Sequence, residues 1–99
     1  MIYRFADRRL ERLYQQGTGS ERYPQGVAEA FIRRVRLIEA ATDERDLRAS
    51  KSLHFEKLKG GENRYSVRLN QAWRLILTFE KDKNRKIVVI IEINKHYGD

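Results

Sequence analysis

The sequence has no cysteine, so disulfide bonds and thiolate metal sites are excluded. It also has no apolar stretch near the roughly 20 residues that a membrane-spanning helix requires. Charged residues occur in every turn of the first 14 positions, which is unlike a signal peptide. We therefore expect a cytoplasmic protein that makes no use of a membrane.

Histidine is scarce, and carboxylates are not clustered. His54 and His96 are the only histidines, and no spacing of acidic or histidine residues is typical of a zinc or magnesium site. We therefore expect no metal and no cofactor. Because histidine titrates near neutrality, proton transfer by this protein would fall first to these two side chains.

Positive charge is abundant and unevenly distributed. The net charge is +7; residues 1–50 hold 10 basic and 8 acidic side chains, whereas residues 51–99 hold 11 basic and 6 acidic ones. This surplus in the second half favours a polyanionic partner such as a nucleic acid, or an acidic protein.

The length of 99 residues predicts one domain over 1–99. Apolar residues recur on one face of 5–17 and again of 27–42, which predicts two helices, the first ending at Gly17. Residues 1–5 are either an edge strand or a lead-in. Residues 43–50 are expected to form a connector with at most one helical turn.

From position 53 the apolar period changes to two, which is typical of strands. Strands are predicted at 52–59, 64–69, 73–80 and 87–93, and the last is apolar on both faces, as a central strand would be. This order predicts an α+β domain, with two N-terminal helices packed on a curved antiparallel sheet of about four strands.

The loop before Trp73 determines which face carries the arginines. A two-residue loop would put Arg74 on the same face as Val67. A three-residue loop, 70–72, instead pairs Leu69 with Trp73 and gathers the large apolar residues on one face, so we prefer it. The opposite face then carries Arg64, Ser66, Arg68, Arg74 and Thr78.

The segments SLHFEKLKG, RYSVRLNQAWRLILTFE and EINKHYGD together resemble the HigB-type (plasmid killer protein) branch of the RelE/ParE toxin superfamily. The resemblance extends over essentially the whole chain. It implies a toxin of a type II toxin–antitoxin system, a ribosome-dependent endonuclease that cleaves messenger RNA and contacts ribosomal RNA. It also implies a helix-turn-helix, HigA-like antitoxin as partner, with promoter DNA bound only through the toxin–antitoxin complex.

The resemblance implies roles for individual residues. His54 matches an active-site position, Lys59 matches the lysine placed against the scissile phosphate, and Arg74 matches the arginine of the central strand that contacts RNA phosphate. Four further cations are expected to bind the RNA: Lys57, Arg64, Arg68 and Lys95.

The tail departs from the family pattern. Many members end in Asp-Tyr-His, whereas Lys95-His96-Tyr97 stands here. Metal-free RNA cleavage needs a base, an acid and cations around the phosphate. We expect Arg74 and Lys59 to hold the phosphate and His96 to be the leading proton-transfer group. His54 and Tyr97 are secondary, and which of the three rings is the acid or the base stays open.

Two alternatives from other functional classes also stay open. A ParE-like toxin would inhibit DNA gyrase without cleaving RNA, and it would not need the histidines or the rings of the tail. A non-catalytic or weak RNA-binding toxin is the other alternative, because the order of the tail residues is altered.

Overall fold

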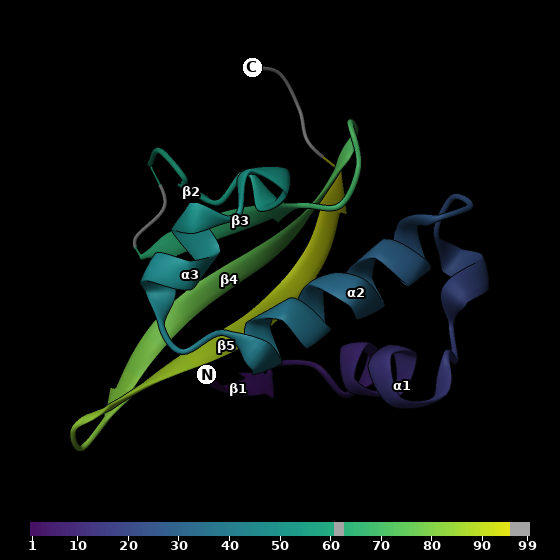
Figure 1. Ribbon diagram of the computed structural model, residues 1–99. Coiled ribbons are helices and arrows are strands. Elements are labelled where there is room, and N and C mark those ends of the chain that lie inside the picture. Colours follow the sequence, from purple (N-terminus) through teal and green to yellow (C-terminus); the bar gives the residue numbers. More distant parts are fainter. Residues whose placement is uncertain (61–62, 96–99) are drawn as a thin grey trace.

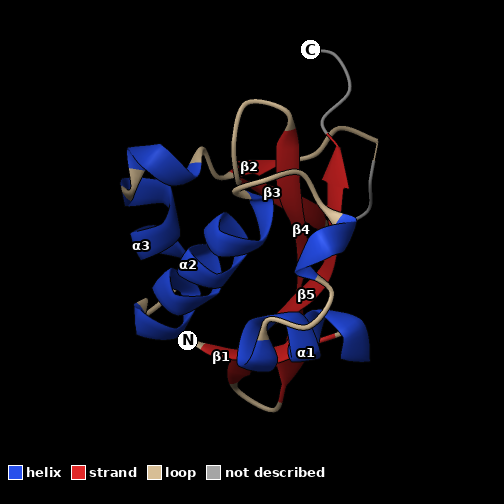
Figure 2. Cartoon of the chain, turned by 90° about the vertical axis from the view of Figure 1, so that its right-hand side faces the viewer, coloured by secondary structure: helices blue, strands red, loops and turns tan. Residues whose placement is uncertain are grey.

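In the computed structural model, which describes residues 1–60 and 63–95, helices pack on one face of a five-stranded sheet (Figure 1, Figure 2). The helices are α1 (Arg8–Gln16), α2 (Val27–Ala40) and α3 (Glu44–Ala49), with short 3-10 helices η1 (Ser20–Arg22) and η2 (Lys51–Leu53). The strands are β1 (Ile2–Phe5), β2 (Glu56–Lys57), β3 (Arg64–Arg68), β4 (Trp73–Asp82) and β5 (Arg85–Lys95), and they lie side by side in the order β1-β5-β4-β3-β2. Within the described ranges, none of the helices combines the length and the apolar character needed to cross a membrane.

Helix α1 is bounded by residues that satisfy its free backbone groups. The Asp7 carboxylate accepts a hydrogen bond from the Arg9 N–H at 2.7 Å, as an N-cap does. Gly17, at φ 74°, ends the helix by donating its N–H to the Leu13 carbonyl at 3.0 Å. The first helix is therefore confirmed, with bounds shorter than the 5–17 predicted.

Helix α2 lies across the sheet and supplies most of the helical side of the core (Figure 1). Val27, Phe31, Val35 and Ile38 are each 0 % exposed, and their spacing of four, four and three residues forms one stripe of the helix. Complete burial of such a side chain stabilises the fold by about 1.5–3 kcal/mol. The predicted second helix is confirmed, and it ends at Ala40.

The segment after α2 is more helical than expected. Residues 44–49 form α3, a helix of six residues, where at most one turn was predicted. Asp43 caps it by accepting a hydrogen bond from the Arg45 N–H at 2.9 Å, and Leu47 is buried in the core. One buried residue makes no visible period, so the sequence pattern did not reveal this helix.

The predicted strand over 52–59 is largely wrong. Residues 51–53 form η2, and only Glu56 and Lys57 pair with β3. His54 lies between these two elements in a left-handed conformation, with φ 48° and ψ 48°. The chain therefore turns sharply at His54, where the sequence predicted extended backbone.

Strand β1 adds a fifth strand to the predicted four. It pairs in parallel with β5, from Ile2 opposite Ile87 to Phe5 opposite Ile90, so the sheet is antiparallel everywhere except at this edge. Strand β5 consequently lies inside the sheet, and Val88 and Ile90 are fully buried. The α+β class, the helical layer and the interior position of β5 are as predicted.

The preferred three-residue loop is confirmed. The Leu69 N–H donates to the Trp73 carbonyl at 2.9 Å, and Arg68 lies opposite Arg74 in the register of β3 and β4. The Asn70 side chain closes the loop, because its carbonyl oxygen accepts the N–H groups of Ala72 and Trp73, each at 2.8 Å. Arg74 therefore lies on the sheet face that points away from the helices.

Candidate active site around Arg74

The guanidinium of Arg74 lies at the centre of a polar cluster and is held from three sides. Its Nη1 lies 3.3 Å from the Ser66 hydroxyl, 3.5 Å from the His54 carbonyl and 3.4 Å from a carboxylate oxygen of Glu56. Only 11 % of the Arg74 side chain is exposed, and Ser66 is buried. Held in this way, the cation can point at a substrate with little loss of conformational entropy.

An imidazole and a carboxylate flank this cation. His54 Nε2 lies 3.9 Å from Glu56 Oε2, and the two side chains are 54 % and 44 % exposed. The left-handed turn at His54 produces this geometry, because it directs the carbonyl toward Arg74 and leaves the ring in solvent. A cation, a carboxylate and an imidazole thus meet at one accessible position.

Arg68 is the cross-strand neighbour of Arg74, so two guanidinium groups project from the same face of the sheet. Like charges directly opposite each other disfavour strand pairing. Arg68 makes one long hydrogen bond, from Nε to the Asn70 carbonyl at 3.4 Å, and finds no carboxylate among the described residues. An anion bound between the two arginines would relieve this repulsion.

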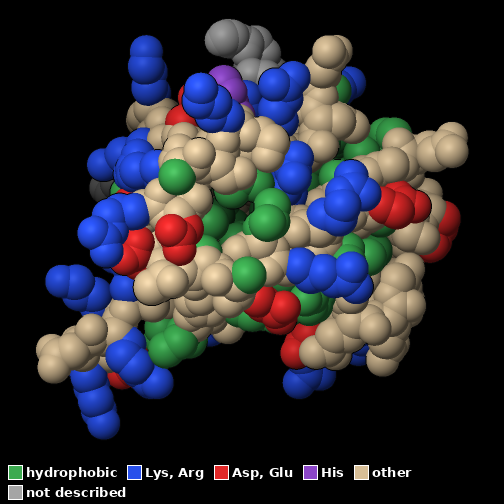
Figure 3. Space-filling view, in the orientation of Figure 1, with side chains coloured by type: hydrophobic (Ala, Val, Ile, Leu, Met, Phe, Trp, Pro, Cys, Tyr) green, Lys and Arg blue, Asp and Glu red, His purple; other side chains and the backbone are tan. Residues whose placement is uncertain are grey.

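A groove of about 300 Å³ opens beside the cluster. His54 and Glu56 form one wall, and Arg48 and Lys51 add two more cations. The Arg48 guanidinium lies 5.1 Å above the ring of Phe55, which fixes its position. On the face that Figure 3 shows, several Lys and Arg side chains surround the exposed histidine.

The structure does not bring every predicted residue to this cluster. Lys59 lies exposed in the turn after β2, and no hydrogen bond or ion pair within 1–60 and 63–95 connects it to the site. Lys57 pairs with Tyr65, and strand alternation puts it on the opposite face from Glu56. Arg64 is exposed on the face of Arg74.

The end of β5 distributes its side chains in the same alternating way. Lys95 lies opposite Trp73, on the helical face, whereas Asn94 lies opposite Arg74 and shares its face. His96 and Tyr97, the two predicted rings of the tail, lie outside the described residues.

Sequence reasoning placed Ser66 on the face of Arg74 but missed Glu56 as a neighbour of Arg74. Both pair across β2 and β3 in register, so they lie on one face of the sheet. The alternation around Ser66 placed it on the face of Arg74, but nothing in the sequence identified Glu56, because β2 is only two residues long. Within the described ranges, no group of three or more His, Cys, Asp or Glu side chains is arranged to hold a metal ion.

Comparisons with known proteins identify the family of this chain. A family model described as a RelE-like toxin of the type II toxin–antitoxin system HigB matches residues 3–97. The toxin HigB-1 of Vibrio cholerae is 32 % identical over 77 residues, which cover 77 % of this chain and 81 % of that one. An uncharacterized protein of Haemophilus influenzae is 32 % identical over 80 residues, covering 80 % and 79 % of the two chains.

A solved structure supports the same fold. A YoeB/ParE toxin from Agrobacterium tumefaciens aligns over 98 % of this chain and 100 % of its own, with a TM-score of 0.56 and 15 % identity. At this identity the likeness concerns the fold alone. The family match over nearly the whole chain carries the assignment: the chain belongs to the HigB-like family of RelE-like toxins in type II toxin–antitoxin systems.

Proposed function

We propose that this toxin is a metal-independent endoribonuclease that cleaves messenger RNA on the translating ribosome, in the cytoplasm. The observation that carries the proposal is the nearly buried guanidinium of Arg74, held beside Glu56 and His54 and opposite a second arginine, Arg68. Phosphodiester cleavage builds negative charge on the phosphate oxygens, and a preorganised cation stabilises that charge.

The chemistry follows from the positions of these groups. Arg74 and Arg68 bind the non-bridging oxygens of the scissile phosphate. Glu56 accepts the proton of the 2′-hydroxyl, whose oxygen forms a bond to phosphorus as the bond to the 5′-oxygen breaks. A protonated imidazole then donates a proton to the departing 5′-oxygen, leaving a 2′,3′-cyclic phosphate and a 5′-hydroxyl end.

Two histidines are candidates for the general acid that donates a proton to the 5′-oxygen. We assign this role to His96, which the sequence predicts as the leading proton-transfer group and which lies outside the described residues. His54 Nε2 lies 3.9 Å from Glu56 Oε2, close enough to assist the proton transfer. Tyr97 would stack on a base or help with proton transfer. Lys59, Lys57, Arg64 and Lys95 would contact the RNA backbone away from the cleaved bond.

The ribosome is a fitting partner for this site. His54 and Glu56 are both about half exposed, so the described part of the site is open on its solvent side. A large RNA partner that holds the message against Arg74 would supply the positioning that the toxin lacks. We further propose that a cognate HigA-like, helix-turn-helix antitoxin neutralises the toxin, with promoter DNA bound only by the complex.

The test is induction of the toxin alone in growing cells, with primer extension on translated and untranslated copies of one message. New 5′-hydroxyl ends should arise inside the translated copy, and growth should stop. Arg74→Ala and His96→Ala should abolish both effects, whereas Arg33→Ala, which removes an exposed arginine of α2, should retain them. Double-strand DNA breaks with intact messages would identify a gyrase inhibitor, and growth arrest with neither effect would identify a non-catalytic RNA-binding toxin.

A further inference from the structure

A second, separate cluster of arginines surrounds a small cavity between α1 and the segment 17–23. The cavity has a volume of about 80 Å³, and Arg9, Arg12 and Arg22 line it together with Tyr23. None of the residues that line it is acidic. Two glycines produce this arrangement, because positive φ angles at positions 17 and 19 turn the chain back over α1.

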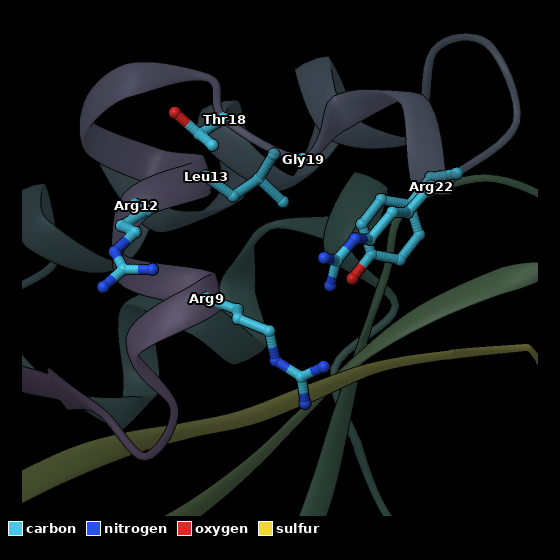
Figure 4. Close-up of a pocket in the computed structure, with 7 residues that line it drawn as sticks. Arg9, Arg12, Leu13, Thr18, Gly19 and Arg22 are labelled. Carbon is cyan, nitrogen blue, oxygen red and sulfur yellow. The ribbon is translucent and has the colours of Figure 1, made fainter.

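The charges around this cavity are incompletely neutralised. Arg9 pairs with Asp7 at 3.2 Å, but Arg12 and Arg22 have no carboxylate within 4.0 Å among the described residues. Figure 4 shows Arg9 and Arg22 extending toward one another from α1 and from the loop, with Leu13 between α1 and the cavity. Converging guanidinium groups of this kind bind phosphate or carboxylate by charge-assisted hydrogen bonds.

The cavity lies near the end of β4 that carries Arg74, but on the opposite, helical face of the sheet. The Tyr23 ring meets the Trp73 ring edge to face, with centroids 6.0 Å apart and planes at 89°. Trp73 immediately precedes Arg74 in β4. A larger groove of about 340 Å³ shares Arg9, Arg22 and Tyr23 with the cavity and extends to residues 91–93 of β5.

The residues of the two spaces differ in charge. Asp7 and Glu92 line the larger groove, whereas the smaller cavity is lined by arginines without carboxylates. An anion is therefore favoured in the smaller cavity. Its volume is several times the 10–15 Å³ or so that one water molecule requires, which suits a phosphate group and is too small for a nucleobase.

We propose that this cavity is a second RNA subsite, which binds a backbone phosphate of the same strand that is cleaved at Arg74. The inference rests on the proposed function, because it assumes that RNA is the substrate. Arginines next to an aromatic ring are typical of single-strand binding surfaces, where the cations contact phosphates and the ring stacks on a base. Because Trp73 and Arg74 lie on opposite faces of β4, the RNA strand would pass around the end of the sheet between the cavity and Arg74.

The salt dependence of RNA binding tests this subsite. A short single-stranded RNA with 2′-O-methyl groups cannot be cleaved, so its dissociation constant can be measured by fluorescence anisotropy between about 50 and 300 mM salt. Each phosphate contact contributes about 0.7 to the slope of log K against log [salt] for single strands. The double variant Arg12→Ala/Arg22→Ala should lower the slope by about 0.7, corresponding to the loss of the one phosphate bound in the cavity.

The control removes the same charge elsewhere. Arg33→Ala/Lys81→Ala changes two exposed cations that line neither space, and its slope should match that of the wild type. Arg12→Gln/Arg22→Gln, which keeps a polar side chain but removes the charge, should reproduce the result of the alanine variant. Thermal unfolding of every variant checks that the fold is retained.

An unchanged slope in both cavity variants would overturn the subsite. An unchanged slope with weaker antitoxin binding would assign the cavity to an acidic protein segment instead. Absence of cleavage by the wild type would refute the proposed function but would leave the slope measurement valid, so the two failures are distinguishable.

Discussion

The guanidinium of Arg74 and the carboxylate of Glu56 face each other across strands β2 to β4, with Nη1 and Oε1 3.4 Å apart. The carboxylate occupies a position that a phosphate oxygen would take when RNA binds. In the proposed function, the same group accepts the proton of the attacking 2′-hydroxyl. In that function, substrate binding and proton transfer are therefore coupled through this pair. Three predictions test the site, and a fourth tests the attachment of α3 to the sheet.

Arg74→Lys should lower the single-turnover cleavage rate by about 10²–10³-fold, because lysine keeps the charge but loses the planar fork that points two donors at phosphate. Arg68→Lys is the matched control, since Arg68 lies on the same face but has only a 3.4 Å bond to the Asn70 carbonyl. Its rate should fall by less than tenfold. Equal losses in the two variants would contradict the central role of Arg74.

Glu56→Gln should separate binding from catalysis. The change removes a negative charge from beside Arg74, so RNA should bind more tightly and KM should fall. Loss of the proton acceptor should reduce kcat by about 10²–10⁴-fold. Steady-state kinetics on ribosome-bound message measure both values, and an unchanged kcat would exclude Glu56 as the base.

His54 can be tested separately for its ring and for its backbone. Asparagine tolerates the left-handed conformation seen at φ 48°, whereas alanine pays about 1 kcal/mol or more for it. His54→Asn and His54→Ala should therefore lose the same moderate fraction of cleavage activity. Only His54→Ala should have a melting temperature several degrees lower, because 1 kcal/mol corresponds to about 4–8 °C for a domain of this size. Equal melting temperatures, measured by circular dichroism, would show that the turn is not strained.

Glu44 should make the stability depend on pH. It accepts hydrogen bonds from Lys86 of β5 at 2.6 Å and from Arg48 at 2.9 Å, so it attaches α3 to the sheet. The hydrogen bond from Lys86, followed by that from Arg48, holds the pKa of the Glu44 carboxyl below its ordinary value. A lowered folded-state pKa stabilises the fold above the unfolded-state pKa, near 4.3, and this contribution is lost as the pH falls through the folded-state value.

Glu44→Gln should accordingly lower the free energy of unfolding by about 1 kcal/mol at neutral pH, with the difference disappearing as the pH falls below about 4. Urea unfolding at several pH values measures this. Glu80→Gln is the control, because its pair with Arg4 is about half exposed and should contribute less. A difference that is constant with pH would contradict the role given to Glu44.

Several features of the site could be predicted because they depend on short-range patterns. The alternation in 64–80 and the length of the 70–72 loop together determine the face of Arg74, and the register is as predicted. The family motif matched His54 and Arg74, and these two residues do lie together. Lys57 and Lys95 lie on the opposite face of the sheet from Arg74, which the motif positions did not reveal, and their contact with RNA stays a prediction.

The sequence alone determined helices α1 and α2, whose boundaries and apolar stripes are local. It also determined the α+β class and the family, whose motifs extend over nearly the whole chain. Only the tertiary structure decided that β1 joins β5 in parallel and that Glu56 meets Arg74. It also decided that Arg9 and Arg22 converge on a second cavity. These contacts join separate segments of the chain through packing and strand pairing. The choice of partner segment leaves no periodic pattern in the sequence.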